Sequence, residues 1–193
     1  MPQEPGEPMR LLSVLIIGLL PILAVAKTLE GINLPEQLTV EGQTLVLNGA
    51  GIREKFFFDI YVAALYLPDR QSDADRILQA DQPWRVTMNF LYAEVDKKKL
   101  DNGWDEGFEA NVPPASLSAL KERLAQFKAM FPTLHKGDEA VLTYLPGKGV
   151  AVSVKGEQKG IIPGADFGRT LLSVWLGKEP VTGKLKKALL GGR

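Results

Sequence analysis

The chain has 193 residues, of which 45% are hydrophobic, and its 23 basic residues balance 23 acidic ones. This length and composition suit one folded domain with a substantial core, and the balanced charge gives no electrostatic case for nucleic acid or an anionic membrane as partner. The absence of cysteine from the sequence excludes disulfides, thiolate nucleophiles and cysteine metal sites.

The N-terminal segment predicts a secretory signal. An apolar run extends from Leu11 to Leu23, and Ala24-Val25-Ala26 supplies an A-x-A cleavage site. We expect residues 1–26 to be a signal peptide, with the true start at Met9, and residues 27–193 to form one exported, periplasmic domain. The apolar run is shorter than the roughly 20 residues that span a bilayer, so we expect no stable membrane span after cleavage.

Alternating apolar residues predict strands in the first half of the remaining chain. The first, QLTVEGQTLVLNGAGI, is broken at Glu41-Gly42. The second, EKFFFDIYVAALYL, is a long strand from Glu54 with apolar residues on both faces, and both faces therefore need cover. After it, SDADRILQA predicts a short helix capped by Ser72, and PWRVTMNFLY predicts another strand.

From Glu94 the apolar spacing changes to about 3.6 residues, which predicts helices. One helix is expected over residues 94–111, and the clearest one follows over residues 116–131. A strand meander, with strands over residues 139–145 and 150–155, precedes two short helices in FGRTLLSVWLG and VTGKLKKALLG. Short connections without a repeating βα period predict an α+β domain, an antiparallel sheet packed against helices.

Motifs for common catalytic sites are missing from the sequence. His135 is the single histidine and lies in a polar segment, so neither a catalytic triad nor a multi-histidine metal site can be built, and we expect it at the surface. The glycines around Lys148 precede a strand, whereas a phosphate-binding loop needs a helix there, so they predict a hairpin turn. We expect no cofactor and no metal.

One arginine stands between a glycine-rich segment and the long strand. The segment NGAG, residues 48–51, predicts a tight turn with positive φ, and Gly51 would let another group come close. From the residues alone, Arg53 is then expected to pair with Glu54 or Asp59 at the surface of a hairpin.

The stretch LNGAGIREKFFFDIYVAALYL resembles the signature of the chalcone isomerase-like family, in its bacterial exported branch, and FGRTLLSVWLGKEPV supports this resemblance from about Thr39 onward. It implies an open-faced β-sandwich: a large antiparallel sheet covered by a layer of helices, with a ligand cleft between them. In plant chalcone isomerases, the arginine that matches Arg53 holds the substrate phenolate and polarises its ketone. In fatty-acid-binding members, the same arginine and a tyrosine hold a carboxylate.

The resemblance also shows departures from the isomerase pattern. Two threonines of the plant enzymes fall at Tyr61 and at Val174, which precedes Trp175, and their catalytic tyrosine falls near Asn111 or Val112. Loss of one oxyanion donor costs about 10² to 10³ in rate, so the loss of several leaves little catalysis.

We therefore expect non-catalytic binding of a small, amphipathic, fatty-acid-like anion, without a cofactor, by Arg53, Tyr61, Val174 and Trp175. Two alternatives stay open. One is a chalcone isomerase-type intramolecular lyase in which Arg53 is catalytic. The other is a periplasmic module that binds a protein partner.

The exported protein should begin at Lys27 and be soluble, because the predicted cleavage follows Ala26. N-terminal sequencing of the exported form measures this directly. Recovery of a membrane-bound form that keeps Leu11 to Leu23 would show that the segment is a retained anchor.

Overall fold

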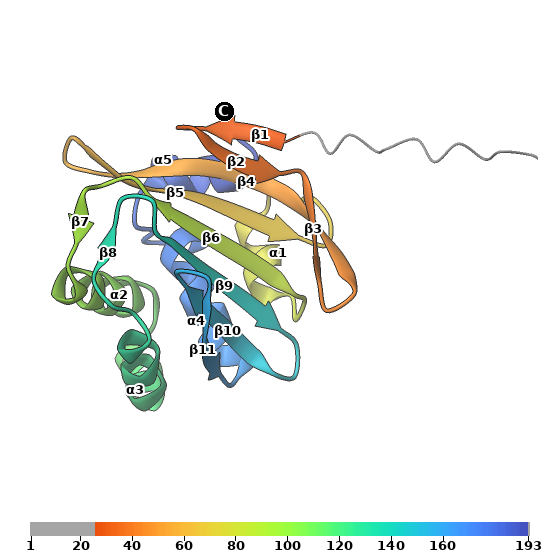
Figure 1. Ribbon diagram of the computed structural model, residues 1–193. Coiled ribbons are helices and arrows are strands. Elements are labelled where there is room, and N and C mark those ends of the chain that lie inside the picture. Colours follow the sequence, from red (N-terminus) through yellow and green to blue (C-terminus); the bar gives the residue numbers. More distant parts are fainter. Residues whose placement is uncertain (1–25, 193) are drawn as a thin grey trace, which may run out of the picture.

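The chain folds into a seven-stranded antiparallel sheet with helices on one face (Figure 1). The structure is a computed structural model that describes residues 26–192. The predicted signal peptide lies outside the described residues, except that Ala26 is the first residue of β1. The strands are β1 (Ala26–Leu29), β2 (Ile32–Pro35), β3 (Gln37–Val40), β4 (Gln43–Lys55), β5 (Phe58–Leu67), β6 (Trp84–Phe90), β7 (Glu94–Val95), β8 (Leu134–His135), β9 (Glu139–Leu145), β10 (Gly149–Val154) and β11 (Glu157–Ile162).

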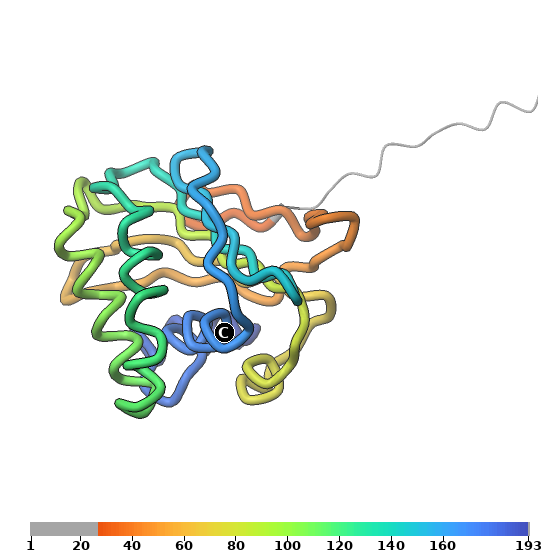
Figure 2. Tube along the Cα trace, turned by 90° about the horizontal axis from the view of Figure 1, so that it is seen from below, coloured from red at the N-terminus to blue at the C-terminus, as the bar shows by residue number. Residues whose placement is uncertain are grey.

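The order of strands in the large sheet is β11-β10-β9-β6-β5-β4-β3, and every neighbouring pair is antiparallel, which confirms the predicted class of sheet. Strands β1 and β2 pair with each other, as do β7 and β8. The helices are α1 (Ala74–Gln79), α2 (Lys97–Asn111), α3 (Pro114–Ala129), α4 (Ala165–Leu176) and α5 (Gly183–Leu189). In Figure 2, α1 and α4 lie below the strands, on one side of the sheet.

Both faces of β5 are buried, as its apolar residues predict. On the inner face, Ala63 and Leu65 belong to the large hydrophobic cluster that includes the buried side chains of α2 to α5. On the outer face, Val62 and Ala64 belong to a second cluster, which Leu34 of β2 completes. The large sheet therefore lies between two apolar layers, and the helices supply the thicker one.

The prediction of a turn at NGAG is wrong, because this segment lies inside β4. Gly49 and Gly51 serve a different purpose: a Cβ on Gly49 would lie 2.2 Å from the carbonyl oxygen of Ala188, and one on Gly51 would lie 2.6 Å from the Cβ of Ala188. The expected close approach at Gly51 is thus made by α5. Asn48 is the extra residue of a β-bulge, and its side chain donates to the carbonyl of Leu189 at 2.7 Å.

The turn lies instead at Phe56 and Phe57, so the predicted strand from Glu54 is two strands, β4 and β5, that meet in a hairpin. A second bulge follows in β5, where Ile60 has no partner between the pairs Arg53–Tyr61 and Glu54–Asp59. The alternation of faces expected for an unbroken strand therefore fails at Ile60. Because of the extra residue, Ile60 and Tyr61 both belong to the inner cluster.

Two predicted helix starts move by a few residues. The N-cap of α1 is Asp73 rather than Ser72, since the Asp73 carboxylate accepts hydrogen bonds from the backbone N–H groups of Asp75 and Arg76 at 3.0 and 3.1 Å. The helix expected from Glu94 starts at Lys97 with Asp96 as its cap, because Glu94 pairs with His135 across β7 and β8.

Replacement of Gly49 by alanine should lower the free energy of unfolding by about 1–3 kcal/mol, because the new methyl group would force α5 away from β4. Gly103→Ala is the matched control: a Cβ at this helical position meets nothing within 4 Å, so alanine should be neutral or stabilising by up to about 1 kcal/mol. Urea denaturation measures both changes. Equal stability of Gly49→Ala and wild type would contradict the close approach of α5.

Candidate functional site

A cavity of about 390 Å³ lies between the inner face of the sheet and the helices. The strands β4, β5 and β6 provide one wall, and α2 with Val174 of α4 provides the other. Most lining side chains are apolar, and the innermost of them are almost completely buried. The lining residues are Arg53, Lys55, Phe56, Phe58, Ile60, Tyr61, Met88, Phe90, Tyr92, Glu94, Val95, Lys99, Leu100, Gly103, Trp104, Val174 and Val181.

Arg53 is the half-buried cation of this cavity. It lies directly opposite Tyr61 in the β4–β5 pair, with its guanidinium carbon 5.7 Å from the centre of the Tyr61 ring. No ion pair joins Arg53 to a carboxylate of the described residues, and Glu54 pairs with Lys184 instead. The surface ion pair expected from the residues alone does not form, and the guanidinium keeps its five N–H donors available.

Tyr61 places a hydroxyl beside Arg53 at the wall of the cavity. Its side chain is 7% exposed, and its oxygen accepts a hydrogen bond from the indole N–H of Trp175 at 3.1 Å. Burial raises the pKa of Tyr61, although the charge of Arg53 and the bond from Trp175 act in the opposite direction. The phenol is therefore neutral near pH 7, and because its oxygen accepts from Trp175, its own proton is free to be donated.

The structure brings three of the four predicted contact residues to the cavity: Arg53, Tyr61 and Val174 line it. Trp175 lies one layer behind, fully buried, where it holds the Tyr61 hydroxyl. Asn111, a candidate for the position of the enzymes' tyrosine, does not line the cavity. Its side-chain amide donates to the carbonyl groups of Gly107 and Glu179 at 2.9 and 2.8 Å, and so joins α2 to the segment after α4.

Sequence reasoning missed most of the apolar wall. Met88 and Phe90 come from β6, whose residues give no sign of a ligand. Leu100 and Trp104 lie in the helix expected over residues 94–111, where their helical spacing indicates only a face packed on the core. Only the packing of α2 against the end of the sheet shows that this stripe is partly a cavity wall. The predicted surface position of His135 agrees with the structure, in which its side chain is half exposed.

The open end of the cavity carries charges of both signs. Lys55 and Lys99 line it together with Glu94, and Lys99 pairs with Asp96 at 3.0 Å. Lys55 makes no ion pair with the described carboxylates. Arg53 is half-buried and lies over the Tyr61 ring, whereas Lys55 and Lys99 are exposed.

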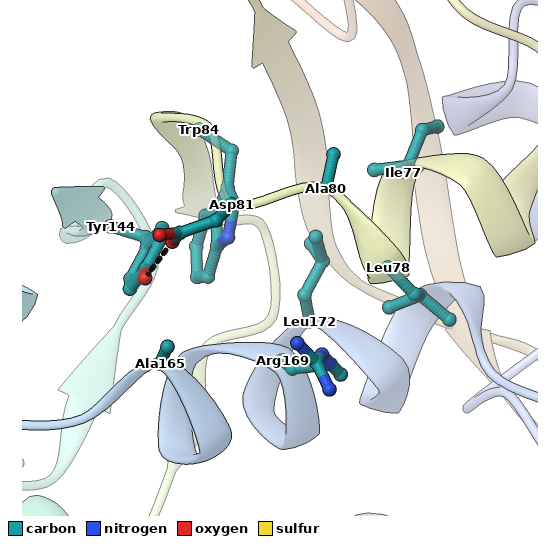
Figure 3. A pocket seen from close by; sticks show the side chains of 9 residues that line it. All are labelled: Ile77, Leu78, Ala80, Asp81, Trp84, Tyr144, Ala165, Arg169 and Leu172. Carbon is teal, nitrogen blue, oxygen red and sulfur yellow. Dashed lines mark hydrogen bonds between the residues drawn. The ribbon is translucent and has the colours of Figure 1, made fainter. Parts of the chain in front are cut away.

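A second cavity, between α1, β6 and α4, is too small for an organic ligand (Figure 3). Its volume of about 10 Å³ is at the lower limit of what one water molecule needs. Here the hydroxyl of Tyr144 donates to the carboxylate of Asp81 at 2.5 Å. Burial and this carboxylate raise the pKa of Tyr144 to about 12. The pair joins β9 to the segment between α1 and β6, which is a structural role.

The described residues give little support to other kinds of site. Among residues 26–192 no group of three or more potential His, Cys, Asp or Glu metal ligands occurs. No helix in that part of the chain combines the length and hydrophobicity needed to cross a bilayer. A further groove of about 460 Å³ lies on the outer face of the sheet, where Arg85 donates to the hydroxyl of Thr143 at 2.8 Å. The cavity with Arg53 and Tyr61 differs from it because its guanidinium has no side-chain partner of this kind among the described residues.

Fold and cavity together define a sheet-and-helix protein with an inner apolar cavity that carries an arginine and a tyrosine hydroxyl. The family model described as chalcone isomerase-like matches residues 26–191, and the chain belongs to this family. In its fold the chain is similar to the crystal structure of a fatty-acid binding protein of Arabidopsis thaliana, with a TM-score of 0.69 and 16% identity over 86% of this chain and 96% of that one. Among curated proteins, none matches the sequence.

Tyr61→Phe should lower the free energy of unfolding by about 1–3 kcal/mol, because the buried indole N–H of Trp175 would lose its acceptor. Tyr92→Phe is the control, since its hydroxyl has no hydrogen bond to the described residues, and its effect should stay within about 0.5 kcal/mol. Chemical denaturation of both variants measures the difference. If the two variants are equally stable, the Tyr61–Trp175 bond does not hold the site together.

Proposed function

We propose that the protein binds a fatty-acid-like carboxylate in this cavity, without transforming it. The observation that supports the proposal best is the Arg53 guanidinium, which has no carboxylate partner among the described residues and lies at the wall of an apolar cavity of about 390 Å³. Small-molecule sites have volumes of roughly 300–1,000 Å³ and combine mostly apolar walls with a few placed polar groups. This cavity has both properties.

Each part of an amphipathic acid has a counterpart in the cavity. A guanidinium presents two parallel N–H donors that match the two oxygens of a carboxylate, and Tyr61 adds a hydroxyl donor beside it. The buried side chains of Met88, Phe90 and Trp104 provide the apolar surroundings that an alkyl tail needs. The carboxylate would lie near Arg53, and the tail would extend toward α2 and α4.

Two further observations support this choice over ring closure of a chalcone. The similar structure from Arabidopsis thaliana is that of a fatty-acid binding protein. Of the positions that correspond to polar groups in the plant enzymes, Val174 offers no hydroxyl, and the Asn111 side chain is engaged between α2 and the segment after α4. We further propose, from the predicted signal peptide, that the protein acts after export.

Calorimetric titration of the delipidated protein with dodecanoic acid tests the proposal. Arg53→Ala should weaken binding ten- to hundredfold, which corresponds to about 1.5–3 kcal/mol for a charged hydrogen bond. Arg53→Lys should recover part of this loss, because an ammonium lacks the planar pair of donors. Tyr61→Phe should cost about 0.5–1.5 kcal/mol of binding, since one neutral hydrogen bond disappears.

Two controls separate an effect on the carboxylate from an effect on the fold. Dodecanol has the same tail without the charge, so Arg53→Ala should leave its affinity nearly unchanged. Arg70→Ala removes an exposed arginine that pairs with Glu36 away from the cavity, and should not alter acid binding. Equal acid affinities of wild type and the three site variants would refute the proposal. Turnover of a chalcone that disappears in Arg53→Ala would support the isomerase alternative instead.

A further inference from the structure

Three consecutive phenylalanines, Phe56 to Phe58, form the end of the β4–β5 hairpin and are exposed to solvent. Their exposed fractions are 84%, 99% and 53%. Large apolar side chains on the surface of a soluble domain are unremarkable when they are scattered, but a contiguous patch marks an interaction site. We refer to residues 56–58 as the phenylalanine tip.

Turn chemistry does not explain these residues. Lys55 pairs with Phe58, so the loop has two residues, and Phe56 has a φ of +58°. Two-residue hairpin loops favour glycine or asparagine where φ is positive, and a bulky side chain there is strained. The sequence therefore has an aromatic residue where the fold alone would favour a smaller one. Phe57, which is almost fully exposed, contributes nothing to either hydrophobic cluster.

The phenylalanine tip is continuous with the open end of the cavity. Phe56 and Phe58 line this end, and the ring of Phe58 packs edge-on against Tyr92 with centroids 5.3 Å apart. An apolar surface thus extends from the exposed tip to the buried wall near Tyr61. A molecule that leaves the cavity on this side therefore contacts the phenylalanine side chains of the tip on its way to solvent.

The size of the patch argues against a stable protein interface. At 150–250 Å² for each phenylalanine side chain, the exposed area of the tip is about 350–600 Å². A stable protein complex buries roughly 800 Å² on each partner. A lipid bilayer, in contrast, accepts a small apolar projection without shape complementarity, and phenylalanine is typical of the apolar side of proteins that bind at the membrane interface.

We propose that the phenylalanine tip inserts into a lipid bilayer and places the open end of the cavity against the membrane. The charges that flank the tip nearly cancel. Lys99 pairs with Asp96, and Lys184 pairs with Glu54. The other charged residues nearby are Lys55, Asp59 and Glu94. Insertion is therefore driven by apolar surface, and binding should depend weakly on salt and on anionic lipid. An acid could then exchange between bilayer and cavity without its tail crossing water. This exchange rests on the proposed function, whereas docking of the tip to a bilayer is independent of it.

Flotation with phosphatidylcholine vesicles, with and without 20% phosphatidylglycerol, measures docking. The protein is produced from Ala26 onward, because every described element and both hydrophobic clusters lie within residues 26–192 and the apolar run before them would bind vesicles by itself. Phe56→Asn with Phe57→Ser should reduce vesicle partitioning at least tenfold. Asparagine tolerates positive φ, so this double variant should be at least as stable as wild type.

Ile161→Ser is the matched control, because it removes a half-exposed apolar side chain from β11, away from the tip, and should leave partitioning unchanged. Absence of vesicle binding by wild type, or equal binding by the double variant, would overturn the proposal. A concentration-dependent dimer in sedimentation that the double variant abolishes would also overturn it, in favour of a second copy of the chain.

Transfer of a fluorescent fatty acid from the same vesicles tests the exchange. The rate of transfer to wild type should rise with vesicle concentration, because transfer occurs when the protein docks on a vesicle. The rate of transfer to the double variant should not depend on vesicle concentration. If vesicles bind wild type but no acid is ever transferred or bound, the proposed function fails while docking stands. If acid transfer is the same for both proteins, exchange at the membrane is wrong.

Discussion

The pairing of β4 with β5 is interrupted twice by a single extra residue, and the site depends on these two bulges. At the first, Asn48 leaves the ladder and bonds to the end of α5, while the glycines beside it let α5 lie against the strand. At the second, the extra residue Ile60 brings Ile60 and Tyr61 to the same face. A bulge re-aims side chains in this way at the cost of one unpaired residue. Without the second bulge, Phe58 and Ile60 would face away from the cavity.

The buried pair of Tyr61 and Trp175 gives the cavity its polar wall. A phenol in an apolar layer costs free energy unless its oxygen has a partner, and the indole N–H of α4 supplies one. The same contact ties the sheet to the helix that forms the opposite wall. Arg53 over the Tyr61 ring then has a neutral, oriented neighbour and no competing carboxylate among the described residues. Such a guanidinium can bind an anion without first breaking an internal ion pair.

Much of this arrangement could be predicted from the sequence, because the spacing of apolar residues within a segment indicates whether it forms a helix or a strand and which of its faces is buried. The antiparallel sheet, the burial of both faces of β5 and the two helices expected over residues 94–111 and 116–131 follow from apolar spacing, with ends that differ by up to three residues from those of α2 and α3. Arg53 and Tyr61 follow from the family resemblance. The turn was misplaced because glycine has two uses. At Gly49 and Gly51 it permits close packing of a helix that is distant in sequence, and no local pattern shows this. The true turn, at Phe56 and Phe57, has none of the residues that turns favour, so the sequence gives no sign of a turn there. Trp175 was expected at the ligand, but its distance from the cavity depends on how α4 packs.

A crystal structure with 12-bromododecanoic acid tests the central claim, that Arg53 binds the carboxylate of an acid whose tail fills the inner cavity. We expect carboxylate oxygens about 2.7–3.2 Å from the guanidinium nitrogens of Arg53, and an anomalous bromine signal beside the buried side chains of Trp104 and Val174. A bromine signal next to Arg53 with the carboxylate elsewhere would contradict it. So would an acid bound only in the groove on the outer face of the sheet, which Arg85 of β6 lines together with residues of β3, β9, β10 and β11.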